Sequence, residues 1–368
     1  MRALLFDWGN TLMRVLPEEV GPTMAHWARV EAIPHAREAL RALHATYLTA
    51  LATNGGAAGV PLVRAALARV GLDESLGDVF TATDLGTRKP DPTFFLAATR
   101  RLGVLPHEAV MIGDSYAEDV VGAKEAGLSA VWWNERRLPC PDTAPLYDAE
   151  LLDMQFLPEL LASPFLPDVS ASLALLEGEG ATRGLVAHSR AVAGAAFLLA
   201  TRLRDRGVPV DPLLAHRGGL LHDLDKASTE MGVEPHGARS GVLLRQLGFE
   251  NLARIAERHP ISSVLHDEGC PTTWEERLVF YADKVVEGDA VVGVDRRIAA
   301  LSRRYPTAPT HLASFASCLP LVLDLEAEIA RRLGVVPLEL LRQNDGHAGG
   351  SFQPHAPHPS RSPSDRLH

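Results

Sequence analysis

The chain has few cysteines, no excess of positive charge and no long apolar run, and each absence excludes a class of protein. Cys140, Cys270 and Cys318 are the only cysteines among 368 residues and form no CxxC pair. Neither a disulfide framework nor a zinc knuckle is expected, and the thiols are expected to be reduced and incidental. Lysine and arginine number 36 against 46 acidic residues, a formal charge of −10. This charge argues against binding of duplex nucleic acid, although a local pocket can still hold a single nucleotide.

The longest strongly apolar run, residues 191–200, is bounded by Arg190 and Arg202 and is too short to cross a bilayer. The opening residues MRALLFDWGN place Asp7 within the apolar stretch, so no signal peptide is expected. We therefore expect a soluble cytoplasmic protein with no membrane partner. The sequence leaves its oligomeric state open.

The length predicts two domains, and a hydrophobic content of 46% is enough for two cores. Residues 1–137 alternate amphipathic segments with the β-type runs ALLF, YLTALATN, DVFTAT, AVMIGD and AVWW. Strand and helix in alternation predict an α/β fold with a doubly wound parallel sheet.

The rest of the chain has a different composition and apolar pattern. Residues 138–169 are rich in proline and are expected to be a linker, with a short helix in LLDMQFLPELLA. Residues 170–343 read as helix with no strand pattern, which predicts an all-α domain. Residues 344–368 lack apolar periodicity and are expected to be disordered.

Side chains suited to phosphoryl transfer follow the predicted strands of the first half. They are Asp7 after ALLF, Thr53 and Asn54 in YLTALATN, Lys89 in TRKPDP, and Asp114 and Asp119 in GDSYAED. Ligands of doubly wound sheets bind at the carboxyl ends of the strands. A carboxylate there can attack phosphorus, a hydroxyl, an amide and a lysine can hold the phosphoryl oxygens, and acidic residues can hold Mg²⁺.

The order of these elements resembles that of the haloacid dehalogenase-like (HAD) hydrolases. The resemblance implies that Asp7 is the nucleophile and a metal ligand and that the Gly9 carbonyl and Asp114 are further Mg²⁺ ligands. It also implies that Asp119 supports the metal site and that Thr53, Asn54 and Lys89 bind phosphate. The sequence leaves little room for a cap: residues 14–32 can form a small lid, so an open site is expected, suited to bulky substrates or closed by the helical half.

One departure from the HAD pattern concerns the general acid. Phosphatases of that superfamily usually read Asp-x-Asp-x-Thr, and the second Asp protonates the leaving group and then activates water. Gly9 stands at that place, and Asn10 beside it cannot exchange a proton at neutral pH. Losing a positioned acid typically costs about 10²–10⁴-fold in rate. This domain is therefore expected to be a slow phosphatase, to use another acid, or to be a scaffold.

A series of imidazoles and carboxylates runs through the helical half. Its members are His188, His222, Asp223, His236, His259 and Asp283. Such nitrogen and oxygen ligands suit a divalent metal inside a helical bundle. The adjacent pair in GGLLHDLDK follows apolar residues, and Lys226 one turn later projects toward an anionic substrate. The isolated histidines His216 and His266 are expected to be hydrogen-bonded structural residues.

This series resembles the HD-domain phosphohydrolases. The resemblance implies that His188, His222, Asp223 and Asp283 bind one metal and that His236 and His259 complete a second site, as in the branch that includes bacterial diadenosine tetraphosphate hydrolases. A site rich in histidine suits Mn²⁺, Fe²⁺, Co²⁺ or Ni²⁺. Lys226 is expected to bind phosphate and assist catalysis. Arg296 and Arg297 are interpreted as a solvated helix face, with phosphate binding as the alternative.

Together these features predict a metal-dependent phosphohydrolase that acts on nucleotides or other small phosphate esters. The helical half is expected to be the main catalyst, beside a Mg²⁺ site that lacks the usual acid. Two alternatives stay open: the first half is the main phosphomonoesterase and the second a cap or regulator, or both halves sense nucleotide or phosphate without turnover.

Overall fold

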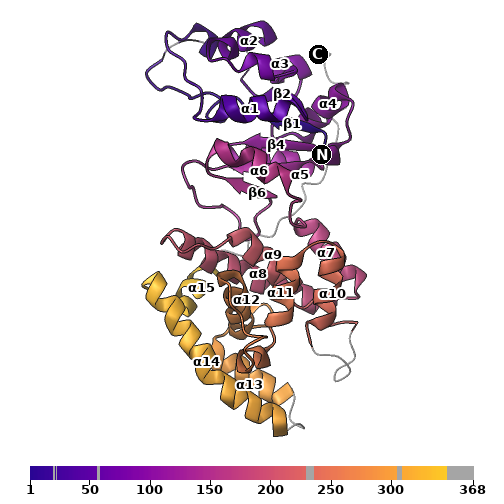
Figure 1. Ribbon diagram of the computed structural model, residues 1–368, viewed down its shortest axis with the longest axis vertical. Helices are drawn as coiled ribbons and strands as arrows, with labels where there is room; N and C mark the ends of the chain where they lie inside the picture. Colours follow the sequence, from indigo (N-terminus) through magenta and orange to yellow (C-terminus); the bar gives the residue numbers. More distant parts are fainter. Residues whose placement is uncertain (20, 22, 56–58, 229–235, 305–308, 346–368) are drawn as a thin grey trace, which may run out of the picture.

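The computed structural model describes residues 1–345 except 20, 22, 56–58, 229–235 and 305–308. An α/β half and a helical half lie one above the other along the long axis of the molecule (Figure 1). The predicted tail, residues 344–368, lies outside the described residues except for Asn344 and Asp345, which are helical and not disordered as predicted. Cys140, Cys270 and Cys318 are free thiols, as expected.

The first half is built on a six-stranded parallel sheet with the order β3-β2-β1-β4-β5-β6. The strands are β1 (Ala3–Phe6), β2 (Leu48–Thr53), β3 (Asp78–Thr81), β4 (Ala109–Gly113), β5 (Ser129–Trp133) and β6 (Ala149–Leu151). In the centre of the sheet, Leu5 pairs with Ala50 on one side and with Met111 on the other. β1 and β4 are buried throughout, as expected of parallel strands covered on both faces. The predicted doubly wound sheet is confirmed.

Helices cover both faces of the sheet because successive strand residues point to opposite faces. Leu4 and Phe6 belong to a core shared with α1 (Ala36–His44), α2 (Gly59–Arg69) and α6 (Leu157–Ala162). Ala3 and Leu5 belong to a second core shared with α4 (Pro92–Leu102) and α5 (Gly122–Glu125). The remaining short elements of this half are η1 (Met24–His26), η2 (Asp73–Ser75), α3 (Ala82–Leu85), η3 (Pro106–Glu108), η4 (Tyr116–Val121) and η5 (Met154–Phe156).

The proline-rich stretch 138–169, which the sequence suggests is a linker, contributes to the sheet. It supplies the edge strand β6 and the helix α6, the latter within the segment predicted to be helical. Ala149 and Leu151 are buried against the core. A strand of three residues among prolines is too short to show a pattern in the sequence.

The second half is a bundle of helices around α8 (Arg183–Arg204), which packs against α9 (Pro212–Leu221) and α12 (Trp274–Val285). The other helices are α7 (Val169–Gly178), α10 (Ala238–Gln246), α11 (Glu250–Arg258), η6 (Ile261–Leu265), α13 (Val294–Arg304), α14 (Pro309–Leu333) and α15 (Pro337–Asp345). α8 is long and apolar enough to cross a membrane, yet half of its apolar window is buried inside this bundle. A hairpin of β7 (Val286–Glu287) and β8 (Ala290–Val291) was not expected, because two-residue strands leave no sequence pattern.

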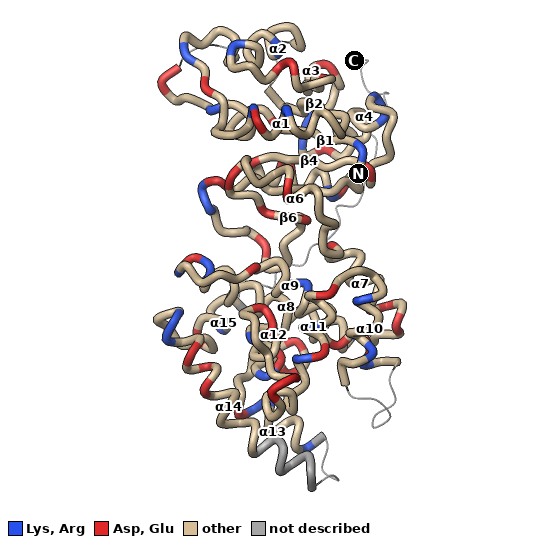
Figure 2. Tube along the Cα trace, in the orientation of Figure 1, with Lys and Arg blue, Asp and Glu red and all other residues tan. Residues whose placement is uncertain are grey.

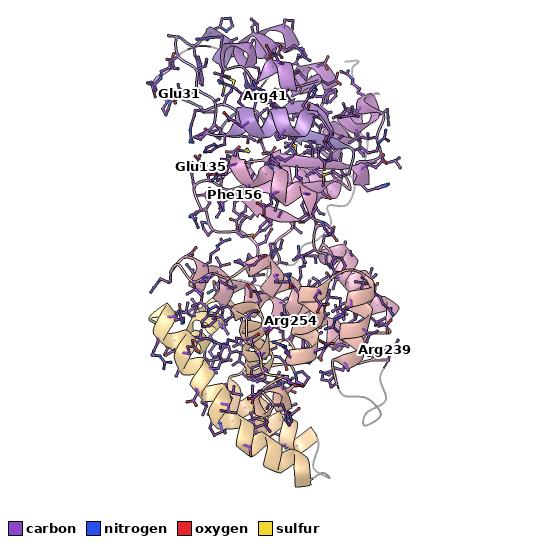
Figure 3. The ribbon with its side chains drawn as sticks, viewed as in Figure 1. Glu31, Arg41, Glu135, Phe156, Arg239 and Arg254 are labelled. Atoms are coloured by element: carbon purple, nitrogen blue, oxygen red, sulfur yellow. The ribbon has the colours of Figure 1, made fainter. Side chains whose placement is uncertain are left out.

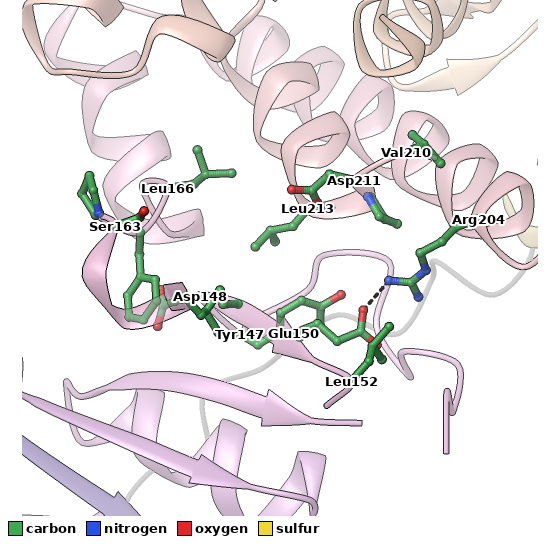
Figure 4. Close-up of a pocket in the computed structure, with 15 residues that line it drawn as sticks. Tyr147, Asp148, Glu150, Leu152, Ser163, Leu166, Arg204, Val210, Asp211 and Leu213 are labelled. Carbon is green, nitrogen blue, oxygen red and sulfur yellow. Dashed lines mark hydrogen bonds and ion pairs between the residues drawn. The ribbon is translucent and has the colours of Figure 1, made fainter. Parts of the chain in front are cut away.

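The two halves meet at the β6 edge of the sheet. Arg217 of α9 is buried and donates to the carbonyl of Pro145 at 2.9 Å. Arg204 of α8 forms an ion pair with Glu150 of β6, beside a cavity of about 350 Å³ between the halves (Figure 4). Two strands, β4 and β5, separate this edge from β1. The contacts therefore join the halves without placing the bundle over the end of β1.

Charged side chains are distributed over both halves. Figure 2 shows Lys and Arg mixed with Asp and Glu along the described chain.

Candidate active sites

The first candidate site lies at the carboxyl ends of β1 and β4. Asp7 directly follows β1 and Asp114 directly follows β4, and the two strands are paired through Phe6 and Ile112. Carboxylate oxygens of Asp7, Asp114 and Asp119 lie within 4.8 Å of one another. The structure thus brings together three acids that are separated by up to 112 positions, since adjacent parallel strands end at the same edge.

Lys89 is the cation of this site. Its Nζ lies 2.7 Å from Asp7 Oδ1 and 2.5 Å from Asp119 Oδ1, and only 1% of the side chain is exposed. Burial alone would lower the pKa of Lys89, but the charges of Asp119 and Asp7 outweigh burial and raise it. Asn54 fixes the lysine backbone, because its side chain accepts from Lys89 N and donates to Lys89 O, both at 2.8 Å. Lys89 therefore stays charged and fixed beside Asp7.

Asp119 holds this arrangement together. Its Oδ1 accepts from Lys89 and its Oδ2 accepts from Ser115 N at 3.0 Å. Gly113 leaves room for the carboxylate, since a Cβ there would lie 2.2 Å from Asp119 Oδ2. With both oxygens engaged, Asp119 is better suited to position Lys89 than to bind an ion directly, whereas Asp7 and Asp114 are more open to one.

The environment of Asp114 is strongly electronegative. Burial, followed by the charge of Asp7, raises the pKa of Asp114 to about 6. Thr11 connects it to the turn after β1, because Thr11 Oγ1 accepts from Asp114 N at 3.1 Å. Asp7 and Asp114 are two close carboxylates whose negative charge nearby cations do not fully neutralise. They offer only oxygen ligands, which Mg²⁺ prefers. The Gly9 carbonyl follows Asp7 in the same turn, and its role as a ligand stays a prediction.

A small cavity of about 60 Å³ adjoins Asp114. Its lining includes Asn10, Arg14, Glu135 and Arg136. Arg14 donates to both oxygens of Glu135 at 2.6 Å, and Figure 3 shows Glu135 at one side of the upper half. Glu135 could not be predicted from the sequence, because it lies in the loop after β5 and belongs to no motif. With both oxygens bound by Arg14, Glu135 does not offer a free proton donor in place of the acid missing at residue 9.

Thr53 and the predicted lid belong to the same half as this site. Thr53 is buried at the end of β2, and its Oγ1 accepts from Gly55 N at 3.0 Å. The two ends of the predicted lid, residues 14–32, are joined by a hydrogen bond in which Arg14 N donates to Glu31 O at 2.9 Å. Phosphate binding by Thr53 and Asn54 stays a prediction.

The second candidate site lies inside the helical bundle. His222 and Asp223 follow the end of α9, His188 is on α8, and Asp283 is near the end of α12. His188 Nε2 lies 3.1 Å from Asp283 Oδ1, and His222 Nε2 lies 3.4 Å from Asp223 Oδ2 and 3.8 Å from Asp283 Oδ1. These four side chains converge although the sequence separates the first from the last by 95 residues.

His236 and His259 extend this cluster on the other side of Asp223. Asp223 Oδ1 lies 2.8 Å from His236 Nε2 and 3.3 Å from His259 Nε2. The two imidazole Nε2 atoms are 3.0 Å apart. Asp223 thus faces one group of imidazoles with each oxygen, so it would be a ligand in both groups if metal is bound. Each proposed ligand role stays a prediction.

The backbone orients three of the four imidazoles. The Nδ1 atoms lie 2.9 Å from Gly288 O for His188, 2.8 Å from Gly219 O for His222 and 2.6 Å from Ala256 O for His259. A carbonyl can only accept, so each Nδ1 carries the proton and each Nε2 offers its lone pair to the centre of the cluster. The sequence could not reveal this arrangement, since any residue supplies a carbonyl.

The protonation states and the burial both fit a metal. Burial is the main cause that lowers the pKa of His259 to about 3, so its imidazole is neutral at physiological pH. Burial would raise the pKa of Asp223, but the neighbouring histidines outweigh it and hold the pKa well below the usual range. Within the described residues, the buried His222 Nε2 has no hydrogen-bond partner. A metal would satisfy this atom.

Three cations surround the carboxylates of the cluster. Lys284 and Arg297 form ion pairs with Asp283, and Lys226 forms one with Asp223. Arg297 is buried and also pairs with Glu287, so the interpretation of Arg297 as part of a solvated face is wrong: α13 turns this side chain inward. The ion pairs of Lys284 and Arg297 with Asp283 could not be predicted, because the sequence does not show which cations face a carboxylate.

The two histidines interpreted as structural differ from each other. His216 is buried, and its Nδ1 lies 2.7 Å from Arg217 Nη1. This contact agrees with the prediction. His266 is exposed in the turn after η6, so the expectation of a buried, hydrogen-bonded side chain does not hold there.

Comparison with known proteins separates the chain into the same two halves. Residues 24–127 match the haloacid dehalogenase-like hydrolase family, and residues 185–287 match the HD domain family. The second match begins three residues before His188 and contains all six ligands proposed in the bundle.

Individual relatives align with part of the chain. Uncharacterized protein MJ0778 of Methanocaldococcus jannaschii is 36% identical over 134 residues, 33% of this chain and 78% of its own length. A glyceraldehyde 3-phosphate phosphatase of Methanopyrus kandleri is 37% identical over 89 residues, 24% of this chain and 37% of its own length. The crystal structure of a HAD phosphatase from Thermococcus onnurineus superposes with 22% identity and a TM-score of 0.37, over 45% of this chain and 100% of that one.

The chain therefore spans little more than a third of the named phosphatase that it resembles in sequence. The family matches have a firmer basis, because each coincides with a half of the structure that has its own core and its own cluster of polar side chains. The chain joins a haloacid dehalogenase-like hydrolase domain to an HD domain.

Proposed function

We propose that the protein is a metal-dependent phosphohydrolase in which the HD half is the principal catalyst, acting on nucleotides or other small phosphate esters. The observation that carries this proposal is the buried His222 Nε2, which lacks a hydrogen-bond partner among the described residues and points into a ring of further imidazoles and carboxylates. A buried polar atom without a partner is costly, so its retention here favours a bound ion. The donor set favours Mn²⁺, Fe²⁺, Co²⁺ or Ni²⁺.

The residues of the bundle would have two roles in hydrolysis, metal binding and substrate binding. His188, His222, Asp223 and Asp283 would hold one ion, and Asp223, His236 and His259 would hold a second. When bound, such ions supply a Lewis acid that activates water for attack on phosphorus. Lys226 pairs with Asp223 and is about one-third exposed, so its ammonium group can also bind an anionic substrate. Burial would lower the pKa of Lys226, but Asp223 and Asp283 outweigh burial and keep it charged.

Replacement of the central carboxylate tests this proposal. In the full-length chain, Asp223→Ala should lose the bound transition metal and the hydrolysis of a nucleotide panel, because Asp223 lies in both groups of ligands. His266→Ala, an exposed histidine outside the cluster, should retain both. Full metal content and turnover in Asp223→Ala would refute the proposal. Tight nucleotide binding by the wild-type protein without turnover would favour a sensor instead.

A second candidate function is favoured by the contacts around Asp7. A carboxylate 2.7 Å from a buried, charged Lys89 is suited to attack the phosphorus of a phosphomonoester. A bond from Asp7 to phosphorus would form as the ester oxygen leaves, and water would then release phosphate from the aspartyl phosphate. The alkoxide needs a proton, which Gly9 cannot give. Loss of Mg²⁺-dependent phosphomonoesterase activity in Asp7→Asn would assign that activity to the HAD half.

A further inference from the structure

His236 differs from the other three imidazoles of the cluster in the partner of its Nδ1, the ring nitrogen that faces away from the cluster. Backbone carbonyls orient His188, His222 and His259 through Nδ1. The Nδ1 of His236 instead faces a carboxylate, Asp225 Oδ1, at 3.6 Å. His236 also has the most exposed side chain of the four, at 39%. Its orientation therefore depends on a side chain rather than on the backbone.

Asp225 is fully buried and held from the other side. Its Oδ2 accepts from Ser240 N at 3.1 Å, and its own backbone N donates to Ser240 Oγ at 2.9 Å. Its Oδ1 accepts no hydrogen bond within the described residues. A buried carboxylate oxygen without a donor is strongly unfavourable. The nitrogen that the structure places before this oxygen is His236 Nδ1, a little beyond hydrogen-bond distance.

We propose that Asp225 is a positioning residue that holds His236 with its Nε2 toward Asp223 and His259, and so assembles the second metal site of the HD half. This inference rests on the proposed function. A carboxylate on the outer nitrogen of a ligand histidine fixes the tautomer and the ring orientation, and the loss of such a partner typically weakens metal binding by roughly 10- to 100-fold. The group of His188, His222 and Asp283 does not contact Asp225 in any described interaction, so it should be unaffected.

Asp225→Asn provides a direct test because its amide has the shape of the carboxylate. The amide oxygen can still accept from Ser240 N, and the amide nitrogen then faces His236 Nδ1. A donor at that place favours the proton on His236 Nε2, where it blocks metal binding. The measurement is a calorimetric titration with Mn²⁺ of the full-length chain carrying Asp7→Asn, which weakens the site of the other half. Electron paramagnetic resonance of the loaded protein would report whether two ions lie close enough to couple.

The parent should bind two Mn²⁺ in the bundle with a coupled signal. Asp225→Asn should bind the first ion normally and the second 10- to 100-fold more weakly, with the coupled signal lost, as should His236→Ala. The double variant should be no worse than His236→Ala, since both changes act through one imidazole. Asp225→Glu, which keeps a carboxylate, should recover part of the affinity, and Asp205→Asn, an exposed acid at the end of α8, should match the parent.

Each contrary result has a distinct meaning. Two ions bound with unchanged affinity in Asp225→Asn would overturn the role of Asp225 and leave the proposed function in place. Equal weakening of both ions, or unfolding of both Asp225→Asn and Asp225→Glu, would also overturn it, because Asp225 would then be merely structural. A parent that binds fewer than two ions in the bundle would contradict the two-metal function itself.

Discussion

The closeness of α8 and α9 sets the geometry of the HD site, and Gly219→Ala should disturb it. A Cβ at Gly219 would lie 2.6 Å from Ala193 Cα and 2.8 Å from Ala193 N. Both atoms belong to the backbone of α8, so no side chain can move aside. Bringing the contact to an ordinary distance requires the helices to separate by roughly 0.8 Å in a closely packed interior. His222 lies three residues after Gly219, and His188 is on the opposing helix.

Overpacking of this kind typically costs about 1–3 kcal/mol. Replacing a helical glycine by alanine returns up to about 1 kcal/mol through helix propensity. We therefore expect Gly219→Ala to destabilise the HD half by about 1–2 kcal/mol, a fall of roughly 2–8 °C in Tm for a domain of this size. Metal ligands tolerate deviations of about 0.2 Å, so the Mn²⁺ affinity should fall by about tenfold or more.

The assay is differential scanning calorimetry of metal-free protein, combined with titration of Mn²⁺. Gly184→Ala is the matched control, because a Cβ there meets only Thr182 Oγ1 at 3.9 Å and the residue lies in the first turn of α8. It should leave the protein as stable as the parent or slightly more stable, with unchanged Mn²⁺ affinity. Wild-type stability and affinity in Gly219→Ala would refute the reasoning that helix contact fixes the ligand geometry.

Two further predictions concern the HAD half. Gly9→Asp should raise Mg²⁺-dependent phosphatase turnover in steady-state assays, since it restores a proton carrier. The new Cβ would lie 3.1 Å from Val15 Cγ2, so that side chain must shift slightly. Turnover equal to that of the wild type would show that a missing acid does not limit the rate. The pKa of Asp114 is raised to about 6, so the folded protein retains a proton there at pH values where the unfolded chain has lost it. This group therefore stabilises the folded state at low pH, and the stabilisation is lost as the pH rises through 6. Because Mg²⁺ must displace that proton, the Mg²⁺ affinity measured by calorimetry should rise about tenfold per pH unit below pH 6 and level off above it. An Mg²⁺ affinity that does not change between pH 5 and 7 would exclude Asp114 as a ligand.

The sequence predicted the central strands of the fold because buried parallel strands read as continuous apolar runs, such as ALLF for β1 and AVMIG for β4. It did not predict β6, whose three residues lie among prolines, or the hairpin of β7 and β8, whose strands have two residues each. These elements are formed by tertiary contacts rather than by local pattern.

The same distinction applies to the HD site. The histidines and acids that the structure gathers could be named in advance, because their residue types and order are unusual for a helical core. The groups that orient these histidines and acids could not be predicted from the sequence. The carbonyl of Gly219 has no sequence signal, and Asp225 and Arg297 look like ordinary charged residues until the packing turns them inward.

We propose that the two halves hold independent metal centres of different chemistry. The most direct test is to remove metal from the full-length protein and add back Mg²⁺ or Mn²⁺ to variants Asp7→Asn and His222→Ala, with hydrolysis of phosphomonoesters and nucleotides as the readout. Mg²⁺ alone should restore only the activity that Asp7→Asn abolishes, because that site offers oxygen ligands. Mn²⁺ should restore the activity that His222→Ala abolishes. A single activity that requires both residues would contradict the account.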